Sequence, residues 1–317
     1  MGSSTRASAS GDTISREAAT LPAVTAWSPA GRRRSEWSRG WQRFKRYRPG
    51  MVGLGFILVL VVLATFPDLF APYPYTQVFR GMRGAPPSWS HPLGFDHIGR
   101  DVLSRIIWGT RVALIVGLLA SGIAVAIGVT VGAAAGYLGG WVDSLLSRLV
   151  DTLMAYPLLV LLITLAAVLG PSLITVVVII GLTTWAQYAR VVRADVLSLR
   201  EREFVLAAQA AGASTARVVF RHVIPNVLGP VIVLASLGIG GIILLESALS
   251  FLGLGAQPPT ASWGGMLADG RAFILTYPQI AIAPGVMISL TVLAFNLVGD
   301  GLRDALDPRQ KDVTINR

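Results

Sequence analysis

Residues 112–137, VALIVGLLASGIAVAIGVTVGAAAGY, decide the fold, because none of these 26 positions holds Asp, Glu, Lys or Arg. An uncharged apolar run of about 18 residues is already long enough to cross the hydrocarbon core of a membrane as a helix. A run longer than that minimum is accommodated by tilting the helix. The sequence therefore predicts an all-α integral membrane protein with a tilted span at this position.

Five more apolar runs flank this segment and predict a total of six transmembrane helices. Of the whole chain, 53% of residues are apolar and 14% are charged, against about 25% charged in soluble domains. Absence of cysteine excludes disulfides, thiolate metal sites and cysteine nucleophiles. No charged residue lies in any of the six runs, which argues against a proton-driven carrier or an intramembrane enzyme. The other five expected spans are 51–66, with an extension to 70, 152–170, 171–189, 227–245 and 280–298.

The segments between the spans carry unequal numbers of positive charges. Alternate segments hold 21 of the Lys and Arg residues and the remaining segments hold 6. The positive-inside rule places the richer set in the cytoplasm, so both termini are expected there. The same charges orient the chain in the membrane, so no nucleic-acid partner is expected. The richer set is 1–50, 138–151, 190–226 and 299–317, and the poorer set is 67–111 and 246–279.

The two ends of the chain are expected to carry no membrane-spanning structure. Residues 1–35 are rich in Ser, Ala and Thr without apolar periodicity, which predicts disorder. The first apolar run begins only at Met51 and no small-residue cleavage pattern follows it, so no cleavable signal peptide is expected.

The inner segment 190–226 reads as helix, turn and helix. Phe204, Ala207, Ala208 and Ala211 recur at helical spacing and form a compact apolar face. Gly212 suits a left-handed helix stop, and Ser214 suits the cap of the next helix. Pro225 is expected to end the pair before the fifth span. Such a pair docks into a partner protein or lies alone at the membrane surface, and periodicity leaves both open.

This inner segment resembles the coupling loop of binding-protein-dependent ABC importers, known as the EAA loop. The resemblance rests on FVLAAQAAG at 204–212, followed by Pro225. In that family the loop docks onto a cytoplasmic ATPase, which implies that the docking residues are Phe204, Leu206, Ala207, Ala208, Ala211, Gly212 and Pro225. The chain has Leu206 where the family usually has Glu.

Three further stretches resemble the dipeptide, oligopeptide and nickel branch of these importers, specifically its C-type permease (DppC/OppC-like). They are HPLGFDHIGRDVLSR at 91–105, ESALSFLGLG at 246–255 with Pro258, Pro259 and Ser262-Trp263-Gly264, and DALDPR at 304–309. With Arg43-Phe44-Lys45, the resemblance covers roughly residues 40–310. It implies a structural role for Asp96, Gly99, Arg100 and Asp101 in the external loop.

The resemblance also implies a type I ABC importer permease core (MetI-like) and a set of partners. These are a homologous B-type permease, two ABC ATPase subunits that bind ATP and Mg, and an extracytoplasmic solute-binding protein, all in a bacterial cell membrane. The expected organisation is a cytoplasmic tail at 1–49, the first helix and external loop at 50–110, the ABC transmembrane domain at 111–301 with coupling loop 190–226, and a cytoplasmic tail at 302–317. The chain lacks a G-x-x-x-x-G-K-[ST] loop, so it is not expected to be an enzyme or to hold a cofactor.

Three residue groups leave alternatives open. Gly128, Gly132 and Gly136 form a small-residue stripe for subunit contact or for internal packing. His91, Asp96, His97 and Asp101 suggest a metal site only weakly, so no metal is expected. Glu246 either faces the translocation path or makes structural hydrogen bonds at the end of the fifth span.

The expected function is half of the translocation pathway of an ATP-driven importer for di- or oligopeptides or related small solutes. The alternative is a stand-alone carrier or channel, and a third class is a membrane scaffold or receptor. Neither of these has a need for the inner helix pair.

Overall fold

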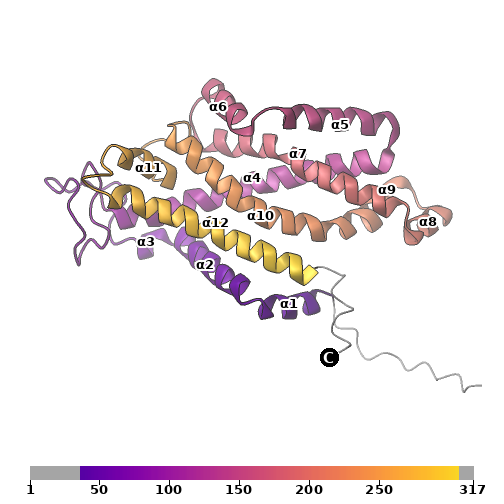
Figure 1. Cartoon of the computed structure of the whole chain (residues 1–317), viewed down its shortest axis with the longest axis horizontal. Helices are drawn as coiled ribbons and strands as arrows, with labels where there is room; N and C mark the ends of the chain where they lie inside the picture. Colours follow the sequence, from indigo (N-terminus) through magenta and orange to yellow (C-terminus); the bar gives the residue numbers. More distant parts are fainter. Residues whose placement is uncertain (1–35, 307–317) are drawn as a thin grey trace, which may run out of the picture. The chain divides into compact units, whose positions relative to one another are not determined.

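The computed structural model describes residues 36–306, and within that part all regular structure is helical (Figure 1). The disorder expected for residues 1–35 lies outside the described residues, as does the tail from residue 307. The elements are α1 (Glu36–Arg46), α2 (Arg48–Thr65), α3 (Pro67–Phe70), α4 (Val102–Leu138), α5 (Gly140–Ala155), α6 (Leu158–Leu169), α7 (Leu173–Arg200), α8 (Glu203–Ala210), α9 (Thr215–Val218), the π-helical turn η1 (Val219–Val223), α10 (Ile224–Phe251), α11 (Trp263–Arg271) and α12 (Gln279–Leu306).

Five helical runs are long and apolar enough to cross a membrane: α2, α4, α7, α12 and the run Thr215–Phe251 that contains α10. They confirm the first, second, fourth, fifth and sixth predicted spans. Their ends extend well beyond the uncharged cores, because α4 begins at Val102 and α7 continues to Arg200. The chain is therefore a multi-pass membrane protein whose helices carry charged ends.

The third span differs from the prediction of one helix over 152–170. Instead α5 and α6 meet at an angle of 87°. Tyr156, directly before Pro157, is extended with φ −86° and ψ 139°, because a proline disfavours the helical conformation of the residue before it. Figure 1 shows α4 ending and α7 beginning at opposite ends of the molecule, so the α5–α6 pair must make the return crossing. By length and composition the bent pair qualifies as one span, which would correspond to the third predicted span and bring the total to six.

The glycine stripe of α4 packs inside the chain, which decides between its two alternatives. A Cβ on Gly132 would lie 2.5 Å from the carbonyl oxygen of Ala189, and one on Gly136 would lie 2.9 Å from that of Arg193. Gly128 faces Tyr188 in the same way. The absence of side chains lets the backbones of α4 and α7 approach closely.

A second close approach joins the N-terminal helices to α12. A Cβ on Gly53 would lie 2.7 Å from the carbonyl oxygen of Ala294, and one on Gly50 would lie 3.2 Å from that of Leu297. The rings of Phe44 and Tyr47 lie against Gly301. Residues 44–53 thus run antiparallel to the last turns of α12.

The two ends of the helical bundle differ in content. At one end, called the hairpin end, Figure 1 shows α8 and α9, and on the same half of the bundle the end of α12 lies beside α1. At the other, called the α11 end, lie α11 and the long segment between α3 and α4. The candidate functional residues divide between these two ends.

Candidate functional site

The segment between α7 and α10 forms a helix hairpin over residues 203–223. The helix–turn–helix prediction is confirmed by α8 and α9. Its expected start at residue 190 is wrong, because α7 continues to Arg200 and leaves only a short connection before Glu203. The hairpin therefore projects directly from the end of a membrane-spanning helix.

The turn of the hairpin is built around Gly212. The backbone N–H of Gly212 donates to Gln209 O at 2.9 Å and that of Ala213 donates to Ala208 O at 3.1 Å. This pair of bonds is a Schellman motif, which needs a left-handed residue at the position of Gly212. Gly212 has φ +79°, as predicted. Ser214 Oγ accepts from Arg217 N at 3.4 Å, which confirms the expected cap.

The hairpin is fixed to the bundle by valines that sequence analysis did not single out. Val205, Val218 and Val223 are fully buried. They belong to one apolar cluster, called the valine cluster, with Ala133, Val192, Val196, Val227 and Val231 of the long helices. The signal was present in the sequence, since every position but one in this set is Val, but the partners of the hairpin valines lie on three separate helices, α4, α7 and α10.

The predicted docking residues lie mostly on the exposed side of the hairpin. Phe204 is 41% exposed and Leu206 is 51% exposed, and Ala207 and Ala211 are exposed as well. Ala208 differs from the other members of the expected face, because it is half-buried and packs against the valine cluster. The hairpin thus presents apolar side chains away from the core.

The junction between the hairpin and α10 differs from the prediction, since Pro225 does not end the pair. The helix is continuous from Thr215 to Phe251. In an α-helix a proline ring clashes with the carbonyl four residues earlier, and here a π-helical turn precedes Pro225 instead of an α-helical one. Asn226 Nδ2 donates to the carbonyl of His222 at 2.6 Å. Pro225 itself is exposed, in the first turn of α10.

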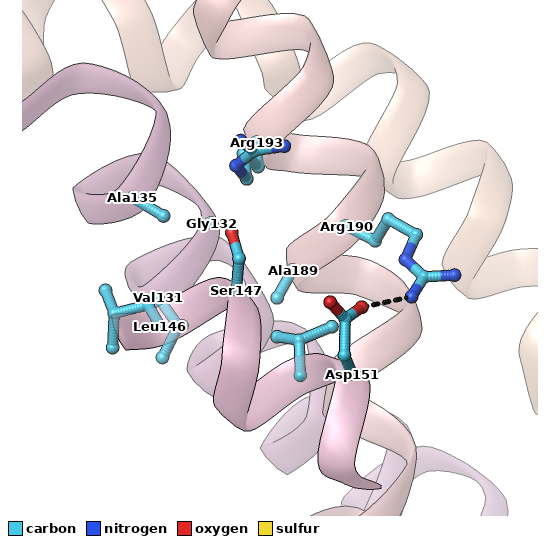
Figure 2. Close-up of a pocket in the computed structure, with 10 residues that line it drawn as sticks. Val131, Gly132, Ala135, Leu146, Ser147, Asp151, Ala189, Arg190 and Arg193 are labelled. Carbon is cyan, nitrogen blue, oxygen red and sulfur yellow. Dashed lines mark hydrogen bonds and ion pairs between the residues drawn. The ribbon is translucent and has the colours of Figure 1, made fainter. Parts of the chain in front are cut away.

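A pocket of about 260 Å³ lies where α4, α5 and α7 meet (Figure 2). Figure 2 shows Asp151 of α5 and Arg190 of α7 facing each other across its edge, with Arg190 Nη2 donating to Asp151 Oδ1 at 2.7 Å. Arg193 donates from Nε and Nη2 to both carboxylate oxygens of Asp143 at 2.5 and 2.8 Å. These two ion pairs connect α5 to α7.

The two pairs differ in their surroundings. Arg190 and Asp151 are 54% and 68% exposed, and such an ion pair in water stabilises a fold by about 0–1 kcal/mol. Arg193 and Asp143 are less exposed, and Ser147 Oγ also donates to Asp143 at 3.1 Å. Sequence analysis did not identify this network, because it assigned these four residues to two separate connecting segments, 138–151 and 190–226, whereas the structure places them on helices α5 and α7.

At the α11 end, the side chain of Asp96 organises the loop between α3 and α4, which is the loop expected to be external. Asp96 is buried, and its carboxylate accepts from the backbone N–H groups of Ile98 and Arg100 at 3.0 and 2.9 Å. It also accepts from Arg100 Nε at 2.6 Å and from Arg105 Nη1 at 3.4 Å. Arg100 Nη2 continues to Asp269 of α11 at 3.4 Å. Burial raises the pKa of Asp269, while the charges of His97 and Arg100 oppose that shift.

Asp101 and Gly99 complete this loop. Asp101 caps α4, accepting from Ser104 N at 2.8 Å and Ser104 Oγ at 2.7 Å. Its other carboxylate oxygen lies 2.8 Å from His91 Nδ1. Gly99 has φ +94°, and a Cβ there would lie 2.6 Å from Phe79 O. The structure thus brings Asp96, Gly99, Arg100 and Asp101 into one connected turn.

Glu246 lies inside α10 and not at the end of its helix, because α10 continues to Phe251. Only 1% of its surface is exposed. Ser250 Oγ donates to its Oε1 at 2.7 Å and Ser247 Oγ donates to Oε2 at 3.3 Å. Ser250 Oγ also accepts from Ala256 N at 3.3 Å, so the carboxylate is connected to the loop after α10.

The four residues weighed as metal ligands have other neighbours. His91 stacks on Tyr73 with ring centroids 4.5 Å apart, and its Nδ1 is occupied by Asp101. His97 stacks on Phe273 at 5.6 Å. Within the described part of the chain, no three His, Cys, Asp or Glu side chains are placed to hold a metal ion.

Comparison with known protein families matches two separate parts of the chain. Residues 128–312 match the family described as "Binding-protein-dependent transport system inner membrane component". Residues 35–87 match the family described as "N-terminal TM domain of oligopeptide transport permease C". The first match contains the hairpin, the pocket and Glu246, and the second contains α1 and α2.

Several curated proteins are similar over most of their length. The chain is 48% identical to the dipeptide transport system permease protein DppC of Escherichia coli, over 86% of this chain and 92% of that protein. It is 43% identical to DppC of Alkalihalophilus pseudofirmus, over 87% and 91%. It is 42% identical to the glutathione transport system permease protein GsiD of Salmonella paratyphi A, over 88% and 92%.

Proposed function

Because this chain belongs to the family of binding-protein-dependent transport system inner membrane components and is a permease of an ABC importer, we propose that its cargo is short peptides. The similar permeases belong to dipeptide and glutathione transport systems. Glutathione is itself a tripeptide, so short peptides are the class that these cargoes share. The resemblance of the chain to the C-type permease branch supports the same class.

The chain works with partners that supply energy and substrate. It pairs with a homologous B-type permease, receives substrate from an extracytoplasmic solute-binding protein, and is driven by two ABC ATPases that hold ATP and Mg. It sits in a bacterial cell membrane with both termini in the cytoplasm, so the hairpin end faces the ATPases. The charge asymmetry of the connecting segments supports this orientation.

The hairpin is the observation that carries the proposal of coupling. Its buried Val205 and Val218 fix it to the bundle, while Phe204, Leu206 and Ala207 are exposed. Apolar side chains that point away from both core and bilayer suit the groove of a partner protein. The surface that contacts the ATPase comprises Phe204, Leu206, Ala207 and Ala211, positioned by Ala208, Gly212 and Pro225.

The remaining site residues have structural roles. The external loop is held in one conformation by four residues. The hydrogen bonds described above for its turn are made by side-chain or backbone atoms of Asp96, Arg100 and Asp101, and Gly99 provides the positive φ. Glu246 holds the loop after α10 through Ser250 and does not line the pathway, which its burial supports.

The test is peptide uptake by the reconstituted complex. The chain, co-expressed with its B-type permease and ATPases, should co-purify with them and take up a radiolabelled dipeptide into proteoliposomes when the binding protein and ATP are present. Gly212→Val should reduce uptake and substrate-stimulated ATP hydrolysis roughly tenfold, because a β-branched residue with positive φ costs about 1–3 kcal/mol. Gly212→Asn is the matched control and should retain most activity, since Asn tolerates this conformation.

Two results would contradict this function. Dipeptide uptake by the chain without ATPase subunits would indicate a stand-alone carrier. If Gly212→Val retained wild-type uptake and substrate-stimulated ATP hydrolysis, the hairpin turn would not be needed for coupling.

A further inference from the structure

Five cations lie on α1, at the start of α2 and near the end of α12, outside the surface assigned to the ATPase. Arg43 is half-buried, while Lys45, Arg46, Arg48 and Arg303 are exposed. We call this group the cation patch. Within residues 40–306, no ion pair involves any of its members. Two exposed acids, Asp300 and Asp304, lie on the same part of α12, so the cations remain in excess.

The patch is held in place on the bundle. Phe44 is 3% exposed, and a Cβ on Gly301 would lie 2.8 Å from its ring. One turn earlier, a Cβ on Gly40 would lie 3.6 Å from the carbonyl oxygen of Ala305. Cations on a helix fixed in this way lose less conformational freedom on binding than cations on a flexible tail.

An aromatic side chain borders the patch. Trp41 is 48% exposed and stacks on Phe44 with ring centroids 5.7 Å apart. Lys45 Nζ lies 5.3 Å from the centroid of the Trp41 ring. A half-exposed tryptophan beside cations is typical of the layer between hydrocarbon and water.

The position of the patch relative to the bilayer follows from α2. Val52 is 70% exposed and Leu58 and Val59 are 56% and 54% exposed, so this face of α2 meets hydrocarbon. Arg48 is the first residue of α2 and precedes Val52 by four residues, which is about 6 Å along the helix, and Arg46 ends α1 two residues earlier. Each headgroup layer of a bilayer is about 5–8 Å thick. The cation patch therefore lies at the level of lipid phosphates.

We propose that the cation patch, bordered by Trp41, is a binding site for the headgroups of anionic phospholipids. Each Lys or Arg near a membrane surface favours anionic lipid, and salt screens the attraction. The chemistry recognised is a phosphodiester in a lipid of net negative charge, such as phosphatidylglycerol. Zwitterionic lipids carry the same phosphate with a compensating ammonium group and bind less well.

The test uses a single cysteine, since the natural chain has none. Gln42→Cys, at an exposed position of α1, is labelled with a fluorophore in the complete complex. The fluorescence that arises from labelling of other sites is measured on the complex without this substitution. The complex is placed in nanodiscs with brominated phosphatidylglycerol or brominated phosphatidylcholine at equal mole fraction. Quenching should favour phosphatidylglycerol, and this preference should fall as salt is raised from 0.05 to 0.5 M.

Matched variants separate the patch from general charge. Lys45→Gln/Arg46→Gln should lower the preference for phosphatidylglycerol roughly tenfold, given the attraction per cation near a surface. Arg80→Gln/Arg83→Gln removes two exposed cations from the α11 end and should leave it unchanged. Equal quenching by both lipids, or a preference that survives Lys45→Gln/Arg46→Gln, overturns the proposal. Loss of ATPase subunits from that variant would show instead that the patch contacts protein, which also overturns it.

Discussion

Three buried carboxylates of the chain are stabilised in three different ways. Asp96 accepts from two guanidinium groups and two backbone N–H groups. Asp101 caps a helix and contacts His91. Glu246 has only the hydroxyls of Ser247 and Ser250. A buried acid without a cationic partner needs such hydrogen bonds to offset the cost of its burial, so loss of either serine should destabilise this part of α10.

Two neighbouring hairpin positions give a residue-scale prediction about coupling. Ala208→Glu places a carboxylate against the valine cluster, which should cost about 1–3 kcal/mol and displace α8. Leu206→Glu places the same group at a position that is 51% exposed, where it meets no core. We expect Ala208→Glu to abolish substrate-stimulated ATPase activity and uptake in proteoliposomes, and Leu206→Glu to retain both.

The paired design controls for charge, since both variants add one Glu to α8. Normal stimulation in Ala208→Glu would show that α8 does not need its contact with the valine cluster. Loss of activity in Leu206→Glu would show that the partner surface excludes a negative charge there.

At the scale of helices, proline illustrates what a sequence cannot specify alone. Pro157 accompanies a bend of 87°, whereas Pro225 follows a π-helical turn inside a continuous helix. Pro230 and Pro284 lie within α10 and α12 without ending them. A single proline leaves a carbonyl free in every case, and neighbouring segments decide whether the helix bends. The break of the third span was therefore not predictable from hydropathy.

The glycine stripe gives an element-scale prediction about stability. Gly132→Ala puts a Cβ 2.5 Å from Ala189 O and 2.8 Å from Val192 Cβ, which should force α4 and α7 apart at a cost of about 1–3 kcal/mol. Gly122→Ala, in the same helix, meets nothing within 4 Å and should be neutral or slightly stabilising. Thermal unfolding of the purified complex, followed by tryptophan fluorescence, should show a lower midpoint only for Gly132→Ala.

If both alanine variants unfold at the wild-type temperature, α4 and α7 accommodate the added Cβ without losing stability. The glycine stripe would then not be needed for their packing. A lower midpoint in Gly122→Ala alone would assign the close approach to the opposite face of α4.

At the scale of the whole molecule, the direction of insertion gives a third prediction. Ser214 and Thr260 are both exposed, on the hairpin and on the loop between α10 and α11. In cells whose cytoplasmic membrane is intact, Thr260→Cys should react with a membrane-impermeant maleimide. Ser214→Cys should react only after that membrane is permeabilised. The chain has no other cysteine, so each signal reports one site. The reverse pattern would contradict the orientation derived from Lys and Arg.

Hydropathy predicted five of the six expected crossings and their order, because each of those uncharged runs is long enough to reach across the bilayer. It did not predict the ion pair between Asp143 and Arg193, since the two residues are 50 positions apart and come from different helices. The turn at Gly212 was predictable from local chemistry, whereas the burial of Val205 depends on the valine cluster, whose other members come from other helices. Local signals are therefore visible in this sequence, and contacts between segments are not.

The unbroken helix from Thr215 to Phe251 has a mechanical consequence. Its 37 residues correspond to a rod of about 55 Å. One end carries the hairpin turn and the other carries Glu246 and its serines. If the rod pivots at its hairpin end, a tilt of about 10° displaces its far tip by about 10 Å. A change of tilt at the hairpin would therefore appear as a much larger displacement beside Glu246, at the far end of the same helix.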